Sequence, residues 1–222
     1  MLLLMSSAAL AESGAYRVEI IIFKNLAVSV DGVQVEEFRS FSGFPALLET
    51  DLPDDLTTIV KKGAHMDGVW RRLRSSKGYQ PLLFAAWQQN RTDYYPPMRI
   101  HDGHIVDEQL LPLGNIMIAD LTAEDPLGAY MSTFYQLDGT LQLRRSRFLH
   151  LYLDLEYREK NQLPESETQS DFFNIKNPAL PESNEYSIYS LQQNRQIRTR
   201  QLQYFDTPYF GALVLVTAIT AD

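Results

Sequence analysis

The chain of 222 residues is long enough for one large domain or two small ones. Its 45% apolar and 22% charged residues are close to the averages for globular proteins, which excludes an intrinsically disordered protein. The formal net charge of -8 argues against nucleic acid as a partner, because phosphate contacts supply most of that affinity. The absence of cysteine excludes disulfides and cysteine-ligated metals, and nothing in the sequence calls for a cofactor.

Residues 1–11 have the pattern of a secretory signal peptide. An apolar run from Leu2 to Leu10 ends at a small-x-small site, Ala9-Leu10-Ala11, although the usual preceding basic residues are missing. Either the true start lies upstream and the signal is truncated, or the run is an ordinary buried segment; we favour the signal. A transmembrane helix needs about 20 apolar residues, and no window approaches that length. We therefore predict a single periplasmic domain over residues 12–222.

Two strands and one helix are predicted in the first half of the chain. Residues 16–23 are rich in β-branched and aromatic side chains and alternate like a strand. Residues 25–62 have no sustained period and are interrupted by Gly and Pro, which predicts loops and short turns. Residues 79–89 are a second strand candidate, although their apolar centre could also continue a helix. Between the two predicted strands, residues 64–76 have the spacing of an amphipathic helix. The apolar side of this helix consists of Met66, Val69, Trp70 and Leu73.

The second half is dominated by strand and turn signals. Asp-Gly pairs at 102–103 and 138–139 predict antiparallel hairpins. Residues 141–157 alternate as one long strand, which we expect to bend or bulge near its arginines. Residues 162–185 lack periodicity and are predicted to be a flexible loop. The chain ends with three more predicted strands, of which the last is apolar on both faces and so belongs inside the sheet; they lie at 186–197, 200–204 and 210–219.

Little helix, two hairpin signals and a buried last strand predict an α+β fold. In this fold a mostly antiparallel sheet packs against one or two helices within a single domain.

Four segments of the chain together match the pattern of a known family. They are YRVEIIIF (16–23), QPLLFAAWQQ (80–89), GTLQLRRSRFLHLYLDLEY (139–157) and RQIRTRQLQYFDTPYFGALVLVTAI (195–219). In these segments the chain resembles the CsiV family of periplasmic cell-shape proteins. The resemblance implies a non-enzymatic periplasmic protein that binds peptidoglycan and supports wall assembly and cell shape. It also implies an adaptor role through the outer-membrane lipoprotein that activates a class A penicillin-binding protein. The chain departs from the family pattern at Gln203 and Thr207, where the family tends to have histidines, so no role of those histidines is carried over to this chain.

Arginines and aromatic residues supply the candidate ligand-binding site. Guanidinium groups donate two parallel hydrogen bonds to a wall carboxylate, and tyrosine rings offer flat faces for sugars. If the two arginine-bearing strands pair, they form one basic patch on an acidic protein. The alternative is ordinary cross-strand pairing with Asp154, Glu156 or Asp206. The candidate residues are Arg144, Arg147, His150, Tyr152, Arg195, Arg198, Arg200 and Tyr204.

Other chemistries are weaker interpretations of the same sequence. Ser146, His150 and Asp154 lie too far apart along a strand to form a catalytic triad. The histidines at 101 and 104 flank a turn, and zinc needs three or four converging ligands. The acidic pairs at 36–37 and 54–55 leave open a peptidoglycan hydrolase with two carboxylates, although adjacent acids in a loop are usually solvated. A protein–protein interaction module without affinity for the wall is the remaining alternative.

Overall fold

A computed structural model of the chain describes residues 15–28, 33–34, 38–47, 56–58, 64–90, 96–110, 131–161 and 186–219. The predicted signal peptide, the predicted loop at 162–185 and the acidic pairs at 36–37 and 54–55 lie outside the described residues.

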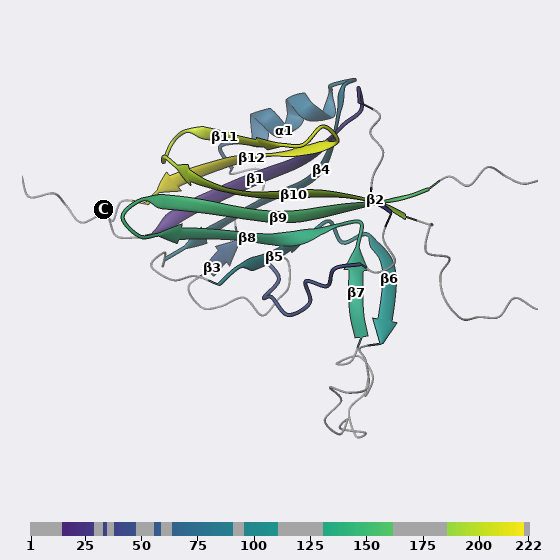
Figure 1. Ribbon diagram of the computed structural model, residues 1–222. Helices are drawn as coiled ribbons and strands as arrows, with labels where there is room; N and C mark the ends of the chain where they lie inside the picture. Colours follow the sequence, from purple (N-terminus) through teal and green to yellow (C-terminus); the bar gives the residue numbers. More distant parts are fainter. Residues whose placement is uncertain are drawn as a thin grey trace, which may run out of the picture.

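The described strands form two five-stranded antiparallel sheets and one two-stranded sheet. Sheet A has the order β11 (Leu202–Asp206), β12 (Phe210–Ala218), β1 (Tyr16–Asn25), β4 (Tyr79–Gln89) and β3 (Leu56–Thr58). Sheet B has the order β2 (Val33–Gln34), β10 (Tyr186–Ile197), β9 (Leu149–Lys160), β8 (Leu137–Arg145) and β5 (Met98–His101). The separate pair consists of β6 (Ile105–Leu110) and β7 (Met131–Tyr135). Figure 1 shows sheet B stacked on sheet A, with β6 and β7 projecting from the sandwich.

The main core lies between the two sheets, because alternate residues of each strand point inward. Sheet A contributes residues such as Ile20, Ile22 and Trp87, and Trp87 is fully buried. Sheet B contributes the leucines of β9, which lie on its inward-facing side. The leucines are Leu149, Leu151, Leu153 and Leu155.

A smaller core lies on the outer face of sheet A, under the helix α1 (Asp67–Arg74). Val69, Trp70 and Leu73 of α1 pack against outward-pointing residues of β1 and β4. The segment that leads into α1 is held by Glu19, which is 1% exposed. Its carboxylate accepts hydrogen bonds from the backbone N–H groups of His65 (2.9 Å) and Met66 (2.8 Å). Glu19 therefore satisfies donors just ahead of α1, whose N-cap residue, Met66, supplies no side-chain hydrogen bond of its own.

The predicted α+β class is wrong. Each sheet has the other sheet as its main packing partner, and the described residues contain a single helix, eight residues long. The apolar spacing of residues 64–76 did identify that helix, which covers part of one outer face. The error arose because the alternating strands were assigned to one sheet, whereas they divide between two. The fold is therefore a β-rich sandwich of antiparallel sheets.

The two Asp-Gly hairpin predictions are also wrong. Asp138 and Gly139 lie inside β8, paired with Glu156 and Leu155 of β9. Gly103 does occupy a turn with a φ of 78°, but the strands on either side of it do not pair with each other. β5 pairs with β8 and β6 pairs with β7, so this turn leads from one sheet to another. The predicted single strand at 141–157 is two strands, β8 and β9, joined by a turn at 146–148.

An ion pair joins the two sheets at the end of the sandwich opposite that turn. Lys24 of β1 donates to Glu159 of β9 with an Nζ–Oε1 distance of 2.5 Å, and the Tyr209 hydroxyl donates to the other carboxylate oxygen. The Tyr209 ring stacks on Tyr189 of β10, with ring centroids 3.5 Å apart. Burial raises the pKa of Glu159, but the hydrogen bonds from Lys24 and Tyr209 outweigh it, so the pKa lies below its usual range.

Glu159→Gln is expected to lower stability at neutral pH but not in acid. A carboxyl group whose pKa is lower in the folded than in the unfolded chain adds stability above its unfolded pKa of about 4.3. That contribution disappears as the pH falls through the folded value. The difference in Tm between the wild type and the variant should therefore shrink from about pH 6 to about pH 3. Glu108→Gln, an exposed change on β6, serves as the control, and an equal response of the two variants would contradict the assignment.

Candidate ligand-binding face of sheet B

The outer face of sheet B, which is turned away from sheet A, carries polar side chains in rows across β8, β9 and β10. Strand register defines the members of each row, and consecutive rows are about 6.8 Å apart along the strands. Starting from the turn at 146–148, the first three rows are Arg144–His150–Gln196, Gln142–Tyr152–Asn194 and Thr140–Asp154–Gln192. The charge of the face therefore changes along the strands, from a first row that carries basic side chains to two rows of mostly neutral side chains.

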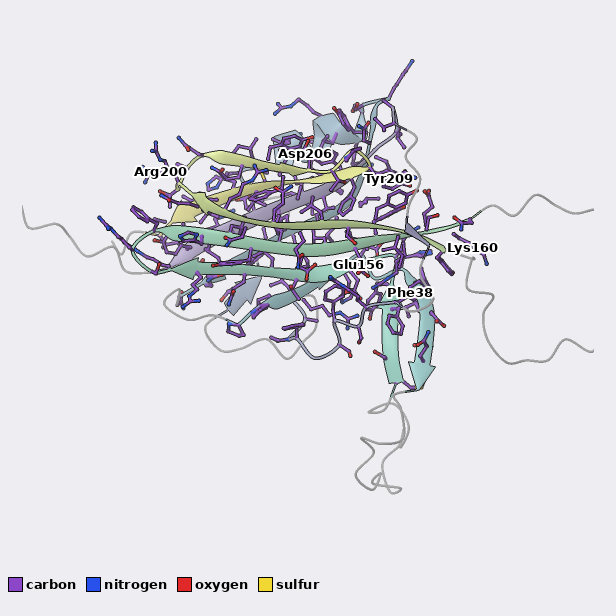
Figure 2. All side chains as sticks on the ribbon, viewed as in Figure 1. Phe38, Glu156, Lys160, Arg200, Asp206 and Tyr209 are labelled. Atoms are coloured by element: carbon purple, nitrogen blue, oxygen red, sulfur yellow. The ribbon has the colours of Figure 1, made fainter. Side chains whose placement is uncertain are left out.

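The first row lies at an end of the sandwich that is rich in arginine. The register pairs Leu149 with both Arg145 and Ile197, so the turn at 146–148 and the turn at 198–201 lie side by side. Figure 2 shows Arg200 at this end, and Lys160 and Tyr209 at the opposite end. We define the basic end by four arginines that form no ion pair with any residue in the described ranges: Arg144, Arg147, Arg198 and Arg200. All four side chains are exposed.

The second and third rows line an open hollow of about 460 Å³. Its lining includes the side-chain amides of Gln142, Gln192 and Asn194, together with the Tyr152 ring. The side chains of Tyr152, Gln192 and Asn194 make no hydrogen bond to any residue in the described part of the chain. Asp154 supplies the carboxylate of the hollow, and one of its oxygens accepts a 2.6 Å hydrogen bond from Arg39. The hollow thus presents donors and acceptors that are available to a ligand.

Beyond the hollow, the outer face is closed by a buried ionic network. Arg99 of β5 donates to both carboxylate oxygens of Asp138, at 2.9 and 2.7 Å, and Asp138 is fully buried. The fully buried Arg158 of β9 lies 3.5 Å from the same carboxylate and donates to Glu156 at 3.0 Å. The Arg158 guanidinium also donates to the backbone oxygen atoms of Tyr135 and Arg39.

Aromatic rings and the segment at 38–47 cover this network. Arg158 lies over the Phe38 ring at 5.0 Å, and Arg39 pairs with Glu156 at 2.7 Å. Burial raises the pKa of Glu156 above its usual range, although the charges of Arg158 and Arg39 oppose the shift. Figure 2 shows Phe38 and Glu156 on the same part of the sandwich. Because these charges are paired and covered, the network is a structural support of the face rather than its ligand-contacting part.

Only part of the predicted site is brought together. Arg144, His150 and Tyr152 share the outer face of sheet B, and Arg147, Arg198 and Arg200 lie in the two adjacent turns. Arg195 points to the other side of β10, where it donates to the backbone oxygen of Tyr204 at 2.9 Å and lies over the Phe205 ring. Tyr204 lies on the outer face of sheet A, stacked on Phe23. Arg195 and Tyr204 therefore do not belong with the other six residues, which lie on the outer face of sheet B or in the adjacent turns.

Sequence reasoning missed Gln192, Asn194 and Arg39 as components of the face. The polar positions of 186–197 alternate with Leu191 and Ile197, and this pattern could have placed Gln192 and Asn194 on the solvent side. Arg39 had no such signal, because the segment that carries it has no periodicity.

The histidines do not form a metal centre with other described residues. His101 is buried, stacks on Tyr135 with ring centroids 3.8 Å apart and accepts a hydrogen bond from the backbone of Gly103. Within the described ranges, no three His, Asp or Glu side chains are grouped so that they could hold a metal ion. His150 and Asp154 belong to the first and third rows, so these two do not meet as a catalytic pair.

The fold and the face define an antiparallel β-sandwich that offers a polar sheet surface to a ligand. The family comparison specifies the class of protein: the chain belongs to the CsiV family, described as peptidoglycan-binding proteins, whose family model matches residues 30–219. Membership of a peptidoglycan-binding family indicates a location in the cell envelope. No described helix has the length and apolar character needed to span a membrane.

Two further comparisons add nothing to the assignment. A search of curated proteins found no match. Among solved structures, the secretin-domain β-barrel of InvG from the Salmonella SPI-1 injectisome base matches with 8% identity and a TM-score of 0.29. That match covers 94% of this chain and 63% of the other, so the chain spans less than two thirds of its length.

Proposed function

We propose that this protein is a non-enzymatic periplasmic adaptor that binds peptidoglycan and supports wall assembly and cell shape. The proposed partner is the outer-membrane lipoprotein that activates a class A penicillin-binding protein. Membership of a peptidoglycan-binding family supports peptidoglycan as the ligand of this chain. The four arginines of the basic end, which form no ion pair with a described residue, support this end as the place where the ligand binds. Signal cleavage near residue 11 and a single mature domain are parts of the same proposal.

The basic end is the observation that carries this proposal. The whole chain has a net charge of -8, yet four exposed arginines gather at one end without an acidic partner in the described residues. The peptide stems of peptidoglycan carry carboxylates, and a guanidinium binds a carboxylate through two parallel hydrogen bonds. A wall ligand can therefore supply the partners that these side chains lack within the protein.

The double change Arg144→Ala and Arg198→Ala is expected to weaken binding to sacculi without unfolding the protein. Hydrogen bonds to charged groups contribute about 1.5–3 kcal/mol each, so losing two should raise the Kd by about a hundredfold or more. The measurement is co-sedimentation of the mature chain with washed sacculi over a range of protein concentrations. Unchanged sedimentation would remove the basic end from the proposal.

The matched control is Arg72→Ala with Arg74→Ala. These arginines are exposed on α1, over sheet A, so their replacement makes the same change in net charge on a different face. We expect the control variant to bind like the wild type. If both double variants lose affinity equally, the effect comes from net charge alone.

The same sedimentation assay tests the class of function. Pelleting without release of soluble muropeptides supports a binding protein, and release over the incubation would contradict the non-enzymatic proposal. A protein that stays in the supernatant but retains the purified lipoprotein activator would be an interaction module without wall affinity. Pelleting of the activator only when this chain is present would support the adaptor role.

A further inference from the structure

We propose that the hollow on the outer face of sheet B binds the N-acetylated glycan strand of peptidoglycan, next to the basic end that takes the stem carboxylates. This inference rests on the proposed function and adds which chemical part of the wall each region holds. It assigns a role to the second and third rows, which carry Tyr152, Asp154, Gln192 and Asn194.

The hydrogen-bonding groups of the hollow suit a neutral ligand. A primary amide offers both donors and an acceptor, and an N-acetyl group offers one N–H donor and one oxygen acceptor. Gln192 and Asn194 project such amides from adjacent outward positions of β10 and make no hydrogen bond to described residues. They can therefore pair with N-acetyl and hydroxyl groups without breaking any internal contact.

An aromatic ring and a fixed carboxylate complete the hollow. Tyr152 lies in the centre of the second row, between Gln142 and Asn194, and is half-buried. Its ring can pack against the apolar C–H face of a pyranose. Asp154 lies in the centre of the third row and is held by Arg39 through one oxygen, which leaves the other oxygen for a sugar hydroxyl.

The charge distribution separates the two parts of the ligand. Asp154, in the third row, makes the hollow unfavourable for a carboxylate. The first row, which offers Arg144 and His150, lies about 6.8 Å beyond the second row along the strands. A glycan in the hollow with its stem directed toward the turns would place each group beside complementary chemistry. At the far end the ion pair of Arg39 with Asp154 and Glu156 limits the hollow.

The test uses a soluble oligomer of N-acetylglucosamine, chitopentaose, which has the N-acetyl groups but no peptide stem and no charge. In two-dimensional NMR titrations of the mature chain, we expect shifts centred on β9 and β10 around Tyr152 and Asn194. Tyr152→Ala and the pair Gln192→Ala with Asn194→Ala should each raise the Kd by about tenfold. Arg144→Ala with Arg198→Ala should leave chitopentaose binding unchanged while it weakens binding to sacculi.

Tyr204→Ala is the matched control, because it removes an exposed tyrosine ring from the outer face of sheet A, away from the hollow. It should bind chitopentaose like the wild type. If the wild type pellets with sacculi but shows no shifts with chitopentaose, the glycan assignment is wrong and the proposed function stands. Binding that Tyr152→Ala and the amide pair leave unchanged would also overturn it. If the wild type does not pellet with sacculi, the proposed function itself fails.

Discussion

Replacement of Asp138 by Asn is expected to lower the free energy of unfolding by about 3–5 kcal/mol. Asp138 is fully buried and accepts two hydrogen bonds from Arg99, while Arg158 lies 3.5 Å from the same carboxylate. Asparagine keeps the shape but removes the charge, so two buried guanidinium groups lose the anion between them. Small domains have a total stability of only about 5–15 kcal/mol, so the loss is a large share of it.

Urea denaturation followed by the fluorescence of the two tryptophans, Trp70 and the buried Trp87, measures this effect. The control is Asp67→Asn, which breaks an exposed ion pair between Asp67 and Arg71 on α1. Exposed pairs contribute about 0–1 kcal/mol, so the control should unfold close to the wild type. If the Asp138 variant lost no more stability than the control, the network would not support the face as described.

Strand and helix positions could largely be predicted from local pattern, because each depends on which residues alternate. The segments at 16–23, 79–89 and 210–219 are strands β1, β4 and β12, and the 3–4 spacing near Trp70 marks α1. How the strands divide between sheets could not be predicted this way. A strand in a sandwich and a strand under a helix show the same alternation, because both bury one face.

The candidate site could be predicted only where its residues lie in one continuous stretch of the sequence, because alternation shows which residues share a face but not which strands pair. Arg144, His150 and Tyr152 alternate with leucines within a continuous stretch, so the sequence alone places these three on one side of the chain. The grouping of Arg198 and Arg200 near that stretch depends on the pairing of β10 with β9, which spacing alone does not reveal. The alternation places Arg195 on the inward-pointing side of β10, opposite to the residues of the rows.

The Asp138-Gly139 pair shows why a strong local signal was wrong. Asp-Gly is favoured in hairpin turns because glycine readily adopts positive φ. In β8 each residue is needed for a different reason: Asp138 neutralises two arginines, and Gly139 leaves room for the neighbouring strand. Neither requirement is local, since the partners are Arg99 of β5 and the backbone of β9. Tertiary contacts therefore select the same dipeptide that a turn would select.

Gly139→Ala is expected to lower the free energy of unfolding by about 4 kcal/mol or more, beyond the range of most single substitutions. A Cβ at this position would lie 2.2 Å from the Asp154 backbone oxygen and 2.7 Å from Leu155 Cα, and the residue has a φ of 155°. Both clashing atoms are backbone of β9, so no side chain can move to relieve them. The measurement is urea denaturation, with circular dichroism to detect a chain that no longer folds.

The matched control is Gly68→Ala in α1, where an added Cβ would meet no atom within 4 Å. Alanine is favoured over glycine within helices by up to about 1 kcal/mol, so this variant should equal or exceed the wild type in stability. The two substitutions add the same methyl group but are expected to change the free energy of unfolding in opposite directions. The comparison therefore separates the effect of close strand packing at Gly139 from the general effect of replacing a glycine. A tolerated alanine at position 139 would mean that β8 and β9 are not paired in this register. The row order of the candidate face, which depends on that pairing, would then be lost with it.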